Sequence, residues 1–280
     1  MDMIEVTTVI GCKNMCSYCP QAITIKNYGN NERVMTPETF RKCIDNIKED
    51  VAISFSGFAE PFQNENAMAM ILHAYAKGHP IRLNTTLAGM TKNDIELLKD
   101  IEIQEFIVHL QTKEEHFVEM AKYLQLLELL CAAISNMRFV YNGGLDERVI
   151  SILKEHNYKP VQLEIKSRAG ALFKQKHKKG RIFCDMKKEI GDNILLPNGD
   201  VVLCCMDFGL KHKLGNLLTQ RFEELHSNSD WKELKKKFDE HDNDLLCRQC
   251  ELSTAYLSLK FPKHIVEKFI YKKWRAMREK

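Results

Sequence analysis

Three cysteines near the start of the chain have a spacing that suits an iron–sulfur cluster. Cys12, Cys16 and Cys19 form a C-x3-C-x2-C pattern directly after a strand-like segment. Three thiolates do not complete a structural zinc site, which would need a distant histidine as its fourth ligand. A cubane cluster contains four irons, so three cysteine ligands leave one iron open for a substrate or cofactor. The spacing therefore favours a [4Fe-4S] cluster over zinc.

A second set of cysteines occupies the C-terminal part of the chain. Its members are Cys184, Cys204, Cys247 and Cys250. Four thiolates on a hairpin and a C-x2-C turn suit either a zinc ribbon or a fully ligated [4Fe-4S] cluster, and spacing alone does not separate these two sites. Cys205 adjoins Cys204, but the G-x4-C pattern that begins at Gly199 selects Cys204 as the ligand.

The first cysteine loop needs a scaffold, and an alternation of strands and helices between residues 4 and 165 supplies one. Strands are expected at residues 4–10, 51–56, 81–85, 105–110, 137–141 and 161–165. Helix start and stop signals lie between them, at Thr36 before Pro37, at Gly78, at Thr91 with Asp94, and over residues 146–156. The alternation predicts an α/β fold with a parallel sheet, open or curled into a partial barrel, whose sites lie at the carboxyl ends of the strands.

The alternation of strands and helices ends after residue 165, and a run of basic residues follows it. Residues 166–184 contain seven lysines and arginines and two glycines, which predicts a linker or lid. Beyond it, apolar segments at 194–197 and 201–204 flank Asn198-Gly199, a strong hairpin signal. We therefore expect a barrel over residues 1–170, a small second domain over 171–260, and a basic helix over 261–280. That helix is expected to pack on its own protein, the alternative being a partner-binding or membrane-surface helix.

The loop over residues 12–19 resembles the signature loop of radical S-adenosylmethionine (SAM) enzymes, including the aromatic residue directly before the third cysteine. By this resemblance, the three cysteines hold a [4Fe-4S] cluster whose open iron chelates the amino and carboxylate groups of SAM, and Tyr18 lies near the adenine. The second strand ends in S-G-F-A-E-P, which is similar to the family's G-G-E-P motif with Ala59 in place of a glycine. The motif implies SAM contacts at Gly57 and Glu60.

Two further strand ends fit the same resemblance. Asn84 closes the third strand where the family often has a T-N-G-like turn, which implies a cofactor contact. On the fourth strand, Gln111 and His109 share one face with Ile107, so both side chains are expected to point into the barrel. The resemblance implies that Gln111 contacts the SAM ribose. For Gln111 and His109 alike, the alternative is a polar side chain satisfied inside the fold.

The second cysteine set resembles the SPASM extension of radical SAM enzymes in its one-cluster "twitch" form, because no cysteine follows Cys250. The resemblance implies one auxiliary [4Fe-4S] cluster, ligated entirely by protein, with a role in electron transfer. Arg168, in an S-R-A-G segment, falls where several twitch enzymes carry an arginine that reaches the substrate. A guanidinium is a good clamp for hydroxyl, carboxylate or phosphate oxygens and a poor base. The alternative is a solvated linker arginine.

The resemblance implies a partial (β/α)6 radical SAM barrel with a small hairpin-plus-helix twitch domain, similar in layout to the twitch aminocyclitol dehydrogenases. The implied activity is that of a radical SAM oxidoreductase. A 5′-deoxyadenosyl radical abstracts hydrogen from a small sugar- or cyclitol-like substrate, and the auxiliary cluster accepts the second electron. The basic run after residue 165 favours an anionic or carrier-linked substrate. The alternatives are a peptide-modifying enzyme (epimerisation, crosslinking or thioether formation), a sugar epimerase, and a non-catalytic zinc protein.

Composition and charge limit the class of protein and the kinds of partner that the chain can have. The chain has 280 residues, 44% of them hydrophobic and 28% charged, which is typical of a globular protein and excludes a wholly disordered one. A net charge of only +3 argues against a global surface for nucleic acid. No apolar run is long enough to span a bilayer, and the first residues lack the basic region of a signal peptide. We expect a cytoplasmic protein that is reduced by a flavodoxin- or ferredoxin-type partner.

Overall fold

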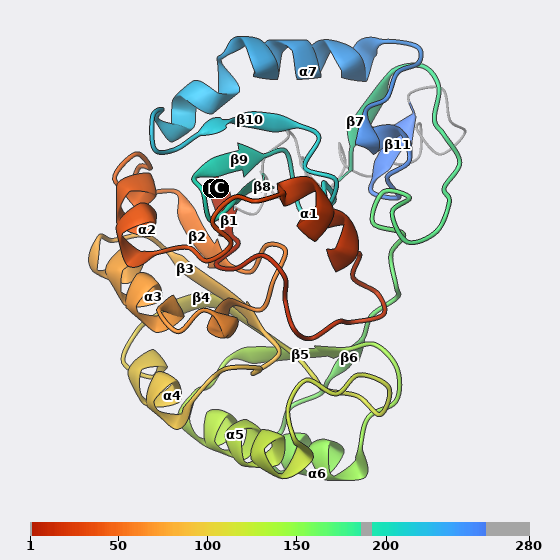
Figure 1. The fold of residues 1–280 in the computed structure, drawn as a ribbon. Coiled ribbons are helices and arrows are strands. Elements are labelled where there is room, and N and C mark those ends of the chain that lie inside the picture. Colours follow the sequence, from red (N-terminus) through yellow and green to blue (C-terminus); the bar gives the residue numbers. More distant parts are fainter. Residues whose placement is uncertain (1, 186–191, 256–280) are drawn as a thin grey trace, which may run out of the picture.

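The main sheet of the protein contains nine strands in the order β10-β9-β8-β1-β2-β3-β4-β5-β6 (Figure 1). The structure is a computed structural model, and it describes residues 2–185 and 192–255. Neighbouring strands from β1 to β6 pair in parallel. They are β1 (Met3–Val6), β2 (Ala52–Phe55), β3 (Ile81–Thr85), β4 (Ile103–His109), β5 (Met137–Tyr141) and β6 (Val161–Gln162). This is the expected α/β architecture, with six parallel strands built by strand–helix alternation.

Helices connect the parallel strands, and those from α2 to α6 lie outside the sheet, whereas α1 packs against the other face, beside β8 and β9 (Figure 1). They are α1 (Gln21–Tyr28), α2 (Pro37–Ile44), the short η1 (Pro61–Gln63), α3 (Ala67–Ala76), α4 (Lys92–Leu98), α5 (Met120–Ala133) and α6 (Glu147–Glu155). The predicted caps are confirmed at three helix starts. Thr36 accepts a hydrogen bond from the Thr39 N–H, Thr91 forms a capping box with Asp94, and Asp146 caps α6. Within the described residues, no helix is both long and apolar enough to cross a membrane.

Three local expectations differ from the structure. The first strand ends at Val6 instead of residue 10, because further along the backbone bonds to residues 33–35 and not to a neighbouring strand: the Ile10 N–H donates to the Arg33 carbonyl, and the Thr8 carbonyl accepts from the Met35 N–H. The last parallel strand has only two residues, both exposed, so little burial holds it in the sheet. Helix α1 was not anticipated, since its sequence carries no apolar stripe of helical period.

The C-terminal part adds strands to the same sheet. Its elements are β7 (Ile182–Cys184), β8 (Asp192–Leu195), β9 (Asp200–Val202), β10 (Lys213–Asn216), η2 (Phe222–His226), α7 (Ser229–Asp239), η3 (Leu246–Arg248) and β11 (Ser253–Ala255). The expected hairpin is confirmed, because β8 and β9 pair antiparallel around Asn198-Gly199. Strand β8 also pairs in parallel with β1, while β7 and β11 form a separate antiparallel pair. The sheet is thus continuous across the predicted domain boundary, and the predicted helix over 261–280 lies outside the described residues.

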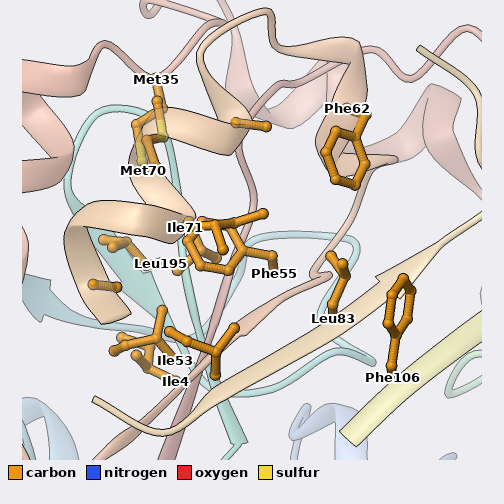
Figure 2. Packing of buried hydrophobic residues seen from close by; sticks show 14 of the residues in the cluster. Ile4, Met35, Ile53, Phe55, Phe62, Met70, Ile71, Leu83, Phe106 and Leu195 are labelled. Atoms are coloured by element: carbon orange, nitrogen blue, oxygen red, sulfur yellow. The ribbon is translucent and has the colours of Figure 1, made fainter. Parts of the chain in front are cut away.

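One hydrophobic core supports the outer face of the sheet. Ile4, Ile53 and Leu195, from three neighbouring strands, pack with Met70 and Ile71 of α3 (Figure 2). Each fully buried side chain of this size contributes about 1.5–3 kcal/mol relative to an exposed one. Because successive strand residues face opposite ways, burial of the apolar residues in this core directs the intervening residues into the barrel.

Candidate active site

A cavity of about 320 Å³ opens at the carboxyl ends of the parallel strands. Most of the site residues expected from the sequence line it: Cys12, Cys16, Tyr18, Cys19, Gly57, Glu60, Asn84 and Arg168. These residues come from the loops after β1 and β2, from β3 and from the segment after β6. Gln111 is not among the described residues that line the cavity. The fold therefore brings distant parts of the chain to one site.

The cysteine loop is held by the loops that follow the neighbouring strands. The Lys13 N–H donates to Gln63 Oε1 over 2.7 Å, after β2. Asn14 Nδ2 donates to Thr86 Oγ1 over 2.9 Å, after β3. Both the N–H and the hydroxyl of Ser17 donate to Glu115, after β4. Backbone placement of the three cysteines thus depends on contacts with three other connections of the barrel.

The three thiols of this loop are partly withdrawn from water. Burial raises the pKa of the Cys12 and Cys19 thiols, and it raises the pKa of Cys16 to about 12. The Tyr18 hydroxyl, which hydrogen-bonds to Cys16, opposes part of that shift. Thiols of this kind stay protonated on their own, whereas metal coordination requires and stabilises the thiolate. Their shared cavity and soft donors fit an iron–sulfur cluster.

The segment after β2 is packed too tightly to tolerate a larger residue at Gly57. Gly57 has a φ of +66°, and a Cβ there would lie 2.2 Å from Thr7 Oγ1 on the chain after β1. The Thr7 hydroxyl instead accepts a hydrogen bond from the Phe58 N–H over 3.0 Å. Glycine at this position therefore lets the second strand end close against the first.

Glu60 is fully buried, and its carboxylate forms hydrogen bonds with neighbouring residues. Its carboxylate accepts from the Thr85 hydroxyl at 2.7 Å and from the Thr86 N–H at 2.6 Å and hydroxyl at 2.7 Å. Burial raises the pKa of Glu60, and these hydrogen bonds act against that rise. Its side chain therefore joins the ends of β2 and β3, so a cofactor would meet the backbone of this segment.

Arg168 lies on a turn of unusual backbone conformation. Arg168, Ala169 and Gly170 have φ values of +54°, +53° and +85° in succession. Ser167 anchors the turn, since its hydroxyl donates to Glu251 over 2.7 Å and accepts from the Gly170 N–H over 3.1 Å. Consecutive left-handed residues are costly and persist only where their surroundings hold them. The turn thus fixes the backbone position from which the Arg168 side chain extends, and the buried Nε of its guanidinium has no hydrogen-bond partner in the described part of the chain.

His109 lines the same cavity from the end of β4. Burial, with a smaller contribution from the positive charge of Arg168, lowers the pKa of His109 to about 4. The imidazole is therefore neutral at physiological pH, with one nitrogen able to accept a hydrogen bond and the other able to donate one. A neutral imidazole near the Arg168 guanidinium offers a ligand a hydrogen-bond donor or acceptor next to a cation.

Gln111 has a different place from the one expected. Its Oε1 accepts from the N–H groups of Phe117 and Val118 at 2.8 and 2.9 Å, and its own N–H donates to the Tyr123 hydroxyl. These bonds shape the loop after β4 inside the fold. The Nε2 group is buried without a partner in the described residues, and its contact with a ribose stays a prediction.

The four cysteines of the second set are neighbours. Cys184 lies in β7 opposite Ser253 of β11, and η3 packs against β7. Burial raises the pKa of Cys247, and the nearby Cys250 and Cys184 raise it further. Burial likewise raises the pKa of Cys204, with additional contributions from Cys205 and Cys247. Burial raises the pKa of Cys250 as well, so three thiols with raised pKa values lie next to Cys184. The four sulfurs are a donor set for a metal centre that stabilises thiolates.

No group of three or more His, Cys, Asp or Glu side chains in residues 2–185 and 192–255 is spaced to hold a single metal ion. A cubane distributes its ligand sulfurs over four separate irons, so a cluster does not require the sulfurs to converge on one point. The shared cavity of the first set and the mutual proximity of the second set are the features that fit clusters.

Comparison with known proteins agrees with this arrangement. Residues 184–251 match the model of the SPASM family, an iron–sulfur cluster-binding domain, and this segment contains all four cysteines of the second set. The chain is 24% identical over 259 residues to the S-adenosyl-L-methionine-dependent 2-deoxy-scyllo-inosamine dehydrogenase of Niallia circulans, covering 89% of this chain and 92% of that protein.

Solved structures of similar fold include one small-molecule complex and two peptide complexes. BtrN in complex with AdoMet and 2-DOIA has a TM-score of 0.56 at 18% identity, covering 86% of this chain and 88% of BtrN. Native anSMEcpe with AdoMet and Cp18Cys peptide has a TM-score of 0.58 at 15% identity, covering 99% and 98% of the two chains. Streptococcus suis SuiB bound to precursor peptide SuiA has a TM-score of 0.60 at 12% identity, covering 89% and 69%.

The chain shares its fold with these solved structures, and its residues 184–251 match the SPASM family model. The predicted fold class is thereby confirmed. Within this fold, Cys204 and Cys205 face different sites, since Cys204 packs against the main core, as Leu246 does, whereas Cys205 lines the cavity with Phe208. This division agrees with the choice of Cys204 as the auxiliary ligand, and that role stays a prediction.

Sequence reasoning missed two acidic residues near the cavity and the first cysteine loop. Glu5 lines the cavity and accepts hydrogen bonds from the Ser56 hydroxyl and the Gly57 N–H, over 3.0 and 3.2 Å. An acidic residue between the apolar Ile4 and Val6 was an available signal for Glu5, because alternation places it on the inner face. Glu115 lies 98 residues from its partner Ser17, and no local pattern marks it.

Proposed function

We propose that this protein is a radical SAM oxidoreductase that dehydrogenates a small sugar- or cyclitol-like substrate. The observation that carries the proposal is the single cavity shared by Cys12, Cys16 and Cys19 with Arg168 and His109. The similarity to a SAM-dependent dehydrogenase over nearly its whole length supports the reaction type. When bound, the reduced cluster and SAM supply a 5′-deoxyadenosyl radical that can take hydrogen from an unactivated C–H bond.

The chain's own residues divide into two binding groups. Cys12, Cys16 and Cys19 bind the first [4Fe-4S] cluster, and Tyr18, Gly57, Glu60 and Asn84 surround SAM. Cys184, Cys204, Cys247 and Cys250 bind the auxiliary [4Fe-4S] cluster. Because four protein ligands leave no iron open, this second cluster supplies an electron acceptor and not a substrate-binding metal.

At the substrate end, Arg168 and His109 have complementary roles. The Arg168 guanidinium clamps substrate oxygens, since its Nε is buried without a partner in the described residues and its turn is fixed by Ser167. The neutral His109 ring hydrogen-bonds to the hydroxyl that becomes a carbonyl. Oxidation of that carbinol removes one hydrogen atom from carbon, one proton from oxygen and one electron. Arg168 and His109 orient the carbon and the oxygen that lose them.

A second candidate is peptide modification, because two proteins of similar fold are described in complex with peptides. The two candidates predict different substrates and different mass changes. Dehydrogenation lowers the mass of the product by two hydrogens, while epimerisation leaves the mass unchanged.

The test is an anaerobic incubation of the reconstituted protein with SAM, a flavodoxin- or ferredoxin-type reductant and a panel of aminocyclitols, sugar phosphates and nucleotide sugars. Mass spectrometry should find a product two hydrogens lighter and 5′-deoxyadenosine in about equal amount. A product of unchanged mass would reject the dehydrogenase assignment and favour an epimerase. SAM cleavage with a precursor peptide and none with the panel would favour peptide modification.

A further inference from the structure

Arg248 is a completely buried cation inside the C-x2-C turn of the auxiliary site. It lies between Cys247 and Cys250 and has 0% exposed surface. Its guanidinium donates five hydrogen bonds, to Asn243 Oδ1 and to the backbone carbonyls of Lys178, Gly180, Lys237 and Glu240. All five acceptors are neutral, and no carboxylate oxygen is among its hydrogen-bond partners in the described structure.

A second cation adjoins the same turn. The Lys178 ammonium donates to the carbonyl of Cys250 and to the Ser253 hydroxyl. The backbones of the two cationic residues also bond to each other, since the Lys178 N–H donates to the Arg248 carbonyl over 2.8 Å. Lys178 and Arg248 therefore form one hydrogen-bonded unit beside two of the auxiliary cysteines.

The nearby carboxylates are engaged elsewhere. Asp185 and Glu251 lie within electrostatic reach of Lys178, and Asp242 within reach of Arg248. Glu251 accepts from Ser167, Asp185 accepts from Thr254, and Asp242 pairs with His177. These three carboxylates act on the two cations through space, whereas the hydrogen-bond acceptors of the Lys178 ammonium and the Arg248 guanidinium in the described structure are all neutral.

A buried charge is costly unless another charge compensates it. Hydrogen bonds to carbonyls satisfy the donors of Arg248 without neutralising it. A cluster held by four thiolates carries a net negative charge, and that charge grows by one when the cluster is reduced. Net charge and hydrogen bonding around a cluster are among the factors that set its reduction potential.

We propose that Arg248 and Lys178 are the counter-charges of the auxiliary cluster and that they raise its reduction potential. Two cations beside the cysteines stabilise the reduced, more negative cluster relative to the oxidised one. The cluster becomes a better electron acceptor as a result. The inference rests on the proposed function for the presence of a cluster at these four cysteines, and it does not depend on the identity of the substrate.

Lys178→Met is the most direct test of the charge, because methionine keeps an unbranched side chain and removes the ammonium group. The protein is reconstituted anaerobically at full length, its iron is counted, and each cluster is titrated against potential by electron paramagnetic resonance. The auxiliary cluster of Lys178→Met should have a lower potential than that of the wild type, while the first cluster keeps its potential. Lys178→Arg should restore a value near the wild type.

The matched control is Lys179→Met, which removes the same charge from an adjacent, exposed residue. Water and salt screen an exposed charge, so this variant should leave both potentials unchanged. Three outcomes would overturn the counter-charge proposal. They are equal shifts of potential in both lysine-to-methionine variants, an unchanged potential in Lys178→Met, and a lowered potential in Lys178→Arg. A protein that binds only one cluster would overturn the proposed function as well. Arg248 is less suitable for substitution, because it supports five carbonyl groups of the fold.

Discussion

The two cysteine sites of this protein differ in construction and in surrounding charge. The first is a short loop of 8 residues that opens into a cavity, with the carboxylates of Glu60 and Glu115 near its thiols. The second is assembled from three separate segments, and it has the cations Arg248 and Lys178 beside it in addition to the carboxylates of Asp207 and Glu251. Negative charge stabilises an oxidised cluster and positive charge a reduced one. We therefore expect the two cations at the C-x2-C turn to favour an electron acceptor at the second site.

The largest expected effect comes from removing the first site. Replacing Cys12, Cys16 and Cys19 together by Ala should remove about half of the iron, because each cubane contains four irons. SAM cleavage should stop completely, while the auxiliary cluster remains. Iron and sulfide analysis with an assay for 5′-deoxyadenosine measures both effects. Retention of SAM cleavage would contradict the assignment of this site.

The second site is tested by two adjacent cysteines. Cys204→Ala should lose the auxiliary cluster and keep the first, because Cys204 faces the other auxiliary cysteines. Cys205→Ala should keep both clusters, since Cys205 lines the cavity. Iron content and absorbance of the two variants provide the measurement. The reverse pattern would mean that the ligand is one residue further along the hairpin than the G-x4-C count predicts.

Glu115→Gln should produce a smaller change at the first site. The amide keeps an acceptor for Ser17 but removes the negative charge near Cys16. The first cluster should then have a higher potential, SAM cleavage should slow, and the auxiliary potential should stay constant. Redox titration of both clusters measures this, with the exposed Glu114→Gln as the control. Equal shifts in the two variants would contradict a specific role for Glu115.

The smallest expected effect concerns His109. Its pKa is lowered in the folded protein from 6.5 to about 4, so the unfolded chain binds more protons between these values. Its neutral form therefore contributes stability that is fully present above pH 6.5 and is lost as pH falls towards 4. Urea unfolding at pH 7 and pH 5 should show a smaller loss of stability in His109→Gln than in the wild type. Arg168→Ala should also reduce this loss, and an identical loss in all three proteins would contradict the shift.

Local sequence patterns predicted those parts of the fold that depend on contacts between residues close together in the sequence. The caps at Thr36, Thr91 and Asp146 were predictable because a side chain bonds to a backbone group within three residues. The positions of β3 and β5 followed from short runs of β-branched and aliphatic residues. The ends of β1 and β6 did not, because contacts with distant strands decide where a strand leaves a sheet.

The sequence by itself determined which residues can hold metal clusters and which fold class presents them, since thiol spacing and strand–helix alternation are properties of neighbouring residues. Only the tertiary structure decided the charge around each cluster site. Glu115 reaches Ser17 across 98 residues, and Arg248 reaches the Lys178 carbonyl across 70. The first contact forms where the loops after the parallel strands converge at one end of the sheet, and the second forms beside the separate β7–β11 pair. Their electrostatic effect depends on burial in the folded chain, which no local spacing encodes.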